Sequence, residues 1–215
     1  MKMRSWLFAP GDSEKKMAKA VAGDADVVIF DLEDAVASEN KPLARRMVHD
    51  YLAASAERRG RIWVRVNPLD GPHTLDDLVA IMPAQPGGIM LPKVYGRADV
   101  ELLDHYLTAF EAAHGLARGS TPVVVLVTEI AEAMFHTGDY KGAPRVVGLS
   151  WGAEDLADSI GRDFLNMFAE RVKQRPVWRA YGLAIDHPRN PRRQGKRCPP
   201  TGLHLRRMLE TGRER

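Results

Sequence analysis

The chain of 215 residues has one cysteine, Cys198, which excludes an internal disulfide framework and a zinc site built on several cysteines. It has no long apolar run either. The apolar piece at the N-terminus ends at Pro10, too short for a signal peptide core or a membrane span, so we interpret it as a strand. No glycine-rich phosphate-binding pattern follows it, and no internal repeat is visible. Together these features predict a cytoplasmic protein without a membrane partner.

Charge is distributed unevenly. Residues 161–215 hold 14 Lys and Arg and 5 Asp and Glu, a net charge of +9, whereas the other 17 basic and 23 acidic residues give 1–160 a net charge of −6. From His187 onward the sequence is rich in Pro, Gly and Arg, with too few apolar side chains to order itself. Solvated disorder is the simplest interpretation, and nucleic-acid binding ranks well behind it because interleaved aromatic residues are lacking. We therefore predict a main domain over 1–160, a partial continuation over 161–186 and a basic tail over 187–215.

Short apolar runs alternate with amphipathic segments along the first 160 residues, which predicts an α/β fold with a parallel sheet. The expected strands cover 5–9, 26–31, 61–66, 88–91, 123–127 and 145–149. The expected helices cover 14–22, 39–55, 74–82, 99–114 and 130–135. Within 74–82 the spacing predicts a core face made of Leu75, Leu78, Val79 and Met82. Further on, the pattern allows a helix over 163–175, a seventh strand over 181–185 and a last helix over 203–209.

Charged residues gather at or just after the ends of these strands, where parallel α/β folds place their chemistry. The residues are Asp12, Glu33, Asp34, Arg65, Lys93, Glu129 and Asp155. Two carboxylates from neighbouring strand ends suit a hard cation such as Mg²⁺, and Glu129 after one strand, with Glu154 or Asp155 after the next, could hold it. A (β/α)₈ barrel and an open doubly wound sheet share this asymmetry, so the pattern leaves both open.

Six motifs resemble, in the same order, those of the citrate lyase β-subunit-like proteins within the HpcH/HpaI aldolase family. They are RSWLFAPGD (4–12), FDLEDAV (30–36), RVNPLDG (65–71), LPKV (91–94), VTEIAEAM (127–134) and LSWGAEDLA (149–157). The resemblance implies a TIM-type (β/α)₈ barrel that assembles as a trimer. It also implies one Mg²⁺ held by Glu129 and Asp155. Family members are longer, and strands seven and eight have no recognisable form after residue 160, which predicts a barrel incomplete at its C-terminal strands.

Other site residues follow from the same resemblance. Arg65 would bind a carboxylate or carbonyl end of the substrate, and Phe8 would line the pocket. Lys15 and Lys19 would approach the coenzyme A portion. Independently of the resemblance, Glu33 and Asp34 lie close enough on the predicted face to orient Arg65 or a metal-bound water.

Each assignment has a simpler structural alternative. Arg65 could form a salt bridge to Glu33 alone, and Lys15 and Lys19 could be an ordinary solvated helix face. Asp155 alone could be a helix cap.

The implied reaction is magnesium-dependent cleavage of a carbon–carbon bond in a short β-hydroxy acyl thioester of the citryl-, malyl- or citramalyl-CoA type, through an enolate. The acyl carrier would be coenzyme A or a carrier protein. The alternative is a truncated, inactive relative that serves as a scaffold or a component of an oligomer.

Overall fold

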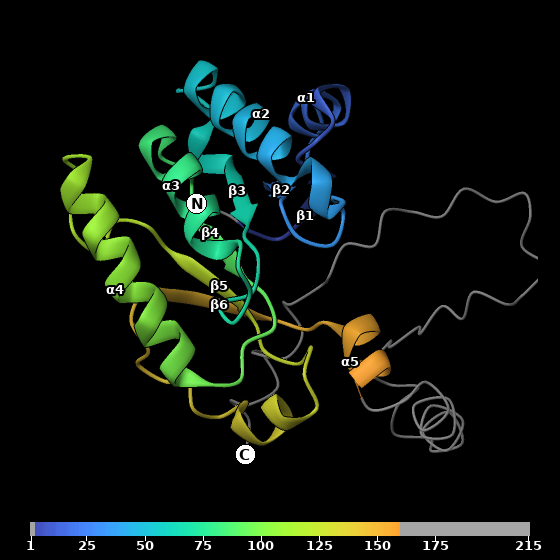
Figure 1. Ribbon diagram of the computed structural model, residues 1–215, viewed down its shortest axis with the longest axis vertical. Coiled ribbons are helices and arrows are strands. Elements are labelled where there is room, and N and C mark those ends of the chain that lie inside the picture. Colours follow the sequence, from blue (N-terminus) through green and yellow to red (C-terminus); the bar gives the residue numbers. More distant parts are fainter. Residues whose placement is uncertain (1–2, 160–215) are drawn as a thin grey trace, which may run out of the picture.

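A computed structural model describes residues 3–159, and the predicted segments over 161–186 and 187–215 lie outside that range. The described residues form one parallel sheet of six strands with helices between them (Figure 1). The strands are β1 (Trp6–Pro10), β2 (Val27–Asp31), β3 (Ile62–Arg65), β4 (Ile89–Leu91), β5 (Val123–Leu126) and β6 (Val146–Ser150). The α-helices are α1 (Glu14–Ala22), α2 (Lys41–Ala54), α3 (Thr74–Ile81), α4 (Arg97–Ala113) and α5 (Ala153–Ser159). Short 3₁₀ helices are η1 (Ser38–Asn40), η2 (Arg59–Arg61), η3 (Met82–Ala84) and η4 (Glu132–His136).

The order of the strands distinguishes the two architectures that the sequence left open. Each strand pairs in parallel with the next one in the chain, in the order β1-β2-β3-β4-β5-β6. A doubly wound sheet reverses its strand order at a switch point, whereas a (β/α)₈ barrel does not. The sheet therefore has the topology of a TIM-type barrel, as the family resemblance implied.

The alternation of side chains along each strand divides the core into two layers. Residues of one parity, such as Phe30 and Val64, pack toward the helices, and Figure 1 shows α1 to α4 following one another along that side of the sheet. Residues of the other parity, including Ile29, Trp63 and Met90, pack together on the opposite, inner side. The inward positions at the carboxyl ends of the strands are where the chain places its charged residues.

One prediction about local structure was wrong, and one predicted short helix has a different helix type and slightly shifted bounds. Leu75 and Val79 of α3 are 50% and 59% exposed, while Leu78 and Met82 are fully buried. The apolar stripe is thus wider than the face that neighbouring elements cover. The helix expected over 130–135 is the 3₁₀ helix η4, which begins at Glu132. Within residues 3–159, no helix combines the length and apolarity needed to cross a membrane.

Candidate functional site

The centre of the candidate site is an arginine held by an aspartate on the adjacent strand. Asp31 ends β2 and lies directly opposite Arg65, the last residue of β3. Arg65 donates from Nε to Oδ1 (2.8 Å) and from Nη2 to Oδ2 (2.7 Å), so one edge of the guanidinium is fully engaged. The backbone N–H groups of Glu33 and Ala35 donate to the same two oxygens, each at 3.0 Å. Asp31 therefore fixes the orientation of Arg65 and the path of the loop after β2.

Two further neighbours surround Arg65. Its Nη1 lies 2.8 Å from Glu33 Oε2, and its guanidinium carbon lies 5.1 Å from the centre of the Phe8 ring. The contact with Phe8 is a cation–π interaction, which also covers one face of the guanidinium. The predicted salt bridge between Arg65 and Glu33 is confirmed. Among the described residues Glu33 Oε2 accepts no hydrogen bond, and Asp31 engages only the edge formed by Nε and Nη2, so the N–H groups between Nη1 and Nη2 can still bind an oxygen ligand.

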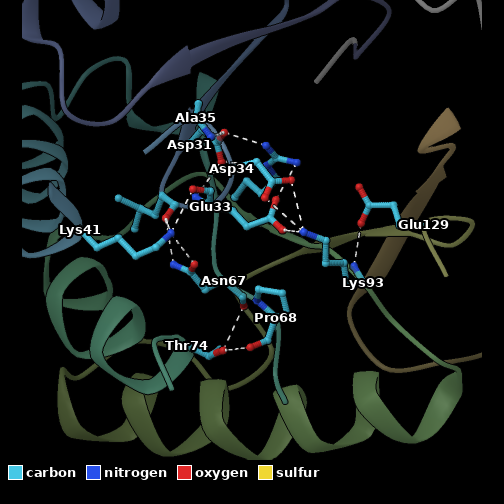
Figure 2. A network of polar contacts seen from close by, with 12 residues as sticks. Asp31, Glu33, Asp34, Ala35, Lys41, Asn67, Pro68, Thr74, Lys93 and Glu129 are labelled. Carbon is cyan, nitrogen blue, oxygen red and sulfur yellow. Dashed lines mark hydrogen bonds and ion pairs between the residues drawn. The ribbon is translucent and has the colours of Figure 1, made fainter. Parts of the chain in front are cut away.

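A lysine joins this group from the loop after β4. Lys93 Nζ lies 2.5 Å from Glu33 Oε1 and 3.2 Å from Asp34 Oδ1 (Figure 2). Burial raises the pKa of the Glu33 carboxyl, against the opposing charges of Arg65 and Lys93. Burial alone would lower the pKa of Lys93, but Glu33 and Asp34 raise it above its usual range. Lys93 is therefore a permanent positive charge between the two acids.

Behind the site, a second lysine holds the loop after β2 in place. The buried Lys41 Nζ donates to the backbone oxygens of Leu32 (2.9 Å) and Glu33 (3.0 Å) and to Asn67 Oδ1 (2.7 Å). Burial lowers the pKa of Lys41. Asn67 is held in turn by Asp77 of α3, which accepts from its backbone N–H (2.8 Å) and its side chain (2.7 Å). This network is structural support for Glu33.

Glu129 lies on the far side of Lys93. Its side chain is buried, and it follows β5 in the loop toward η4. Its Oε2 accepts a hydrogen bond from the backbone N–H of Lys93 at 2.7 Å. Burial raises the pKa of Glu129 to about 7, and the charges of Glu33 and Asp155 act in the same direction. No Lys or Arg of residues 3–159 forms an ion pair with it.

Asp155 stands in the first turn of α5, and its charge acts on Glu129. Both residues supply the carboxylate oxygens that Mg²⁺ prefers. A Cβ at Gly152 would lie 2.2 Å from Glu129 Cγ and 2.9 Å from Oε1, so Glu129 packs directly against the backbone of Gly152, where a side chain would collide with it. A buried carboxylate without a cation partner fits a metal ion. The described residues contain no group of three or more His, Cys, Asp or Glu placed for one, so water and substrate would complete the shell.

The structure brings most of the predicted site residues together. Phe8, Glu33 and Arg65 touch one another, directly or through a shared neighbour, and Glu129 is joined to them through Lys93. Lys15 and Lys19 do not join this group. They are exposed on α1, and within residues 3–159 neither forms a hydrogen bond or an ion pair.

Two contributions were missing from the predicted site. Asp31 was counted only as the end of a strand, yet its inward parity and its place opposite Arg65 make it the main partner of that arginine. Lys93 was noted at its strand end but given no role. Successive side chains of a strand point to opposite faces of the sheet, so Asp31 shares the inner face with Ile29 and Val27, two and four residues before it.

Comparisons with known proteins point to one family. The pattern of the HpcH/HpaI aldolase/citrate lyase family matches residues 4–175. The chain is 36% identical over 161 residues to the malyl-CoA/β-methylmalyl-CoA/citramalyl-CoA lyase of Chloroflexus aurantiacus, covering 72% of this chain and 45% of the relative. It is 35% identical over 187 residues to the (3S)-malyl-CoA thioesterase of Cereibacter sphaeroides, covering 85% and 61%.

A solved structure of a citrate lyase β subunit is similar to this chain as well. The citrate lyase β subunit from M. tuberculosis, complexed with oxaloacetate and magnesium, superposes with a TM-score of 0.60 at 35% identity, covering 74% of this chain and 61% of that one. The chain thus spans about half to three fifths of the length of these relatives.

Proposed function

The chain belongs to the HpcH/HpaI aldolase/citrate lyase family, and from this premise we propose that it is a magnesium-dependent carbon–carbon lyase acting on a short β-hydroxy acyl thioester. One observation carries the proposal. Glu129 is a buried carboxylate with no Lys or Arg partner in the described part of the chain, and it stands near Asp155 on one side of the site while Arg65 is held on the other. The related subunit complexed with oxaloacetate and magnesium supports the same choice of metal.

In this proposal two acidic residues bind the metal ion and the basic residue Arg65 binds substrate oxygens. Glu129 and Asp155 hold Mg²⁺, and Arg65 binds the carboxylate or carbonyl end of the substrate with its end-on edge. Asp31 and Glu33 orient Arg65, and the ring of Phe8 covers one face of its guanidinium. When bound, Mg²⁺ supplies positive charge beside the oxygens on which negative charge develops.

Cleavage breaks the bond between the hydroxyl-bearing carbon and the carbon next to the thioester carbonyl. The hydroxyl loses its proton and becomes a carbonyl, and the bonding electrons pass to the thioester fragment as an enolate, which then takes up a proton. Arg65 is placed to stabilise an oxygen anion, because its orientation is fixed before the substrate arrives. The carrier would be coenzyme A or a protein, and Lys15 and Lys19 would meet its phosphates. The oligomer we expect is a trimer.

The test is a reaction of the full chain with malyl-CoA in the presence of Mg²⁺. Lyase activity yields glyoxylate and acetyl-CoA, whereas thioester hydrolysis releases a free thiol and malate. We expect the lyase products, and we expect Glu129→Gln and Asp155→Asn each to abolish them. Lys16→Ala, on the exposed face of α1, is the control and keeps the activity. A folded chain that binds Mg²⁺ but forms neither set of products would favour the inactive relative.

A further inference from the structure

Lys93 connects three carboxylates of the site through two different groups. Its backbone N–H donates to Glu129 Oε2, while its ammonium lies between Glu33 and Asp34 (Figure 2). Its φ is 51°, in the left-handed region that residues with a side chain rarely adopt. Such strained backbone persists only where the surroundings hold it, and it concentrates at functional sites.

The direction of the Lys93 N–H depends on this backbone conformation. A return to the usual negative φ would rotate the peptide before Lys93 and withdraw the N–H from Glu129. The ion pairs of the Lys93 ammonium with Glu33 and Asp34 are the contacts that oppose such a return. On the other side, the close approach of Gly152 to Glu129 Cγ leaves the carboxylate little room. The position of Glu129 is therefore restricted by the Lys93 N–H on one side and by the Gly152 backbone on the other.

We propose that Lys93 is a positioning residue whose ammonium, anchored on Glu33 and Asp34, holds the left-handed backbone that fixes the Glu129 carboxylate for a divalent cation. The identity of the cation rests on the proposed function, but the hydrogen bond by which Lys93 positions the Glu129 carboxylate does not. Lys93 acts through Glu129. Its ammonium contacts the loop after β2 and its backbone N–H contacts the loop after β5, so it links the positions of the two loops.

The first experiment follows the Lys93 amide in the full chain labelled with ¹⁵N-lysine. Lys93→Arg removes one lysine signal and so identifies it. A hydrogen bond to a carboxylate moves an amide proton downfield, so we expect an upfield shift in Glu129→Gln. We also expect a shift in the double variant Glu33→Gln, Asp34→Asn, because the ammonium loses its anchors. A Lys93 amide shift that is unchanged in the double variant would overturn the proposal, whether or not the protein binds a metal.

The second experiment measures Mg²⁺ affinity by calorimetry. Lys93→Ala loses the anchor and keeps the cost of a Cβ in the left-handed region, so we expect binding about tenfold weaker. Lys93→Gly loses the same anchor but adopts positive φ freely, so we expect a loss of only about threefold. Lys93→Arg keeps the charge and should bind nearly as the parent does. Equal losses in the Ala and Gly variants, or no loss in either, would overturn the proposal.

Gln85 provides a matched control. It has φ of 56°, is exposed, and follows η3 at the opposite end of β4. Gln85→Ala keeps the Cβ and its backbone strain and Gln85→Gly relieves that strain, but neither touches a carboxylate, so both should leave Mg²⁺ affinity unchanged. If the parent chain binds no Mg²⁺ while the amide shifts occur as expected, the proposed function fails and the role of Lys93 in holding Glu129 stands.

Discussion

Glu111 and Glu129 are both buried glutamates, but their surroundings differ in kind. Glu111, in α4, is 0% exposed and accepts hydrogen bonds from Arg145 Nη1 (2.6 Å) and Nη2 (2.9 Å). The backbone N–H groups of Gly119 and Thr121 donate to it as well. Glu129 is 4% exposed and accepts one backbone hydrogen bond, from Lys93. Despite burial, the Arg145 guanidinium lowers the pKa of Glu111 to about 2, whereas burial raises that of Glu129 to about 7.

The two residues lie at opposite ends of the sheet. Arg145 immediately precedes β6, so the Glu111 pair belongs to the end where the strands begin, and Glu129 follows β5 at the end where they finish. A fold that only had to be stable would pair both carboxylates. The difference indicates that the partner of Glu129 is not among residues 3–159, and that Glu111 is part of the framework.

The largest effect is expected at the paired residue. Glu111→Gln leaves Arg145 buried without its main partner, and we expect a loss of about 3 kcal/mol in the free energy of unfolding at pH 7. The melting temperature should then fall by about 6–12 °C. Glu101→Gln, which removes an exposed ion pair with Arg97 on the same helix, is the control and should cost less than about 0.5 kcal/mol. A neutral result at Glu111 would remove the contrast between the two glutamates.

The opposite sign is expected at the unpaired residue. An ionised Glu129 is buried without a cation from residues 3–159, so Glu129→Gln should raise the free energy of unfolding by about 2 kcal/mol at pH 8 in the presence of a chelator. Urea denaturation of parent and variant measures the difference. Destabilisation by the Gln variant would show that the protein already satisfies the Glu129 charge.

The pH dependence sharpens the same contrast. The folded-state pKa of Glu129 lies above its unfolded value of 4.5, so its protonated form stabilises the fold at low pH and that contribution is lost as pH rises through about 7. The advantage of Glu129→Gln should therefore shrink to nothing between pH 7 and pH 4.5. Glu111 has a lowered pKa, so its contribution is present above 4.5 and disappears as pH falls toward 2. Denaturation curves at a series of pH values would contradict this account if both variants followed the same trend.

The smallest effect is expected from crowding Glu129. Gly152→Ala places a methyl group against the buried Glu129 side chain, which has to shift, so the variant should weaken Mg²⁺ binding about tenfold and also lower the metal-free melting temperature. Gly60→Ala is the matched control, because a Cβ there meets nothing within 4 Å. Equal Mg²⁺ affinities in both variants would place the cation away from Glu129.

Much of this was predictable from sequence. The six strands lie within a residue or two of their predicted bounds because buried β-branched runs leave few alternatives. The partner of Arg65 was missed because strand register determines it, and spacing along one strand does not reveal register. The role of Lys93 depends on its positive φ, which the sequence does not indicate because glycine, and not lysine, is the usual residue at such positions. Leu75 and Val79 were assigned to the core because periodicity gives the direction of a helix face but not how much of it is covered.

The central claim is that Glu129 has no Lys or Arg partner within residues 3–159 because a metal ion supplies the positive charge. The most direct test is titration of the full chain and of Glu129→Gln with Mg²⁺ at pH 8, with the melting temperature as the readout. We predict that the parent chain gains stability with each increase in Mg²⁺ and that the variant, more stable at the start, gains none. A parent chain that ignores Mg²⁺, or a variant that responds as strongly as the parent, would contradict the claim.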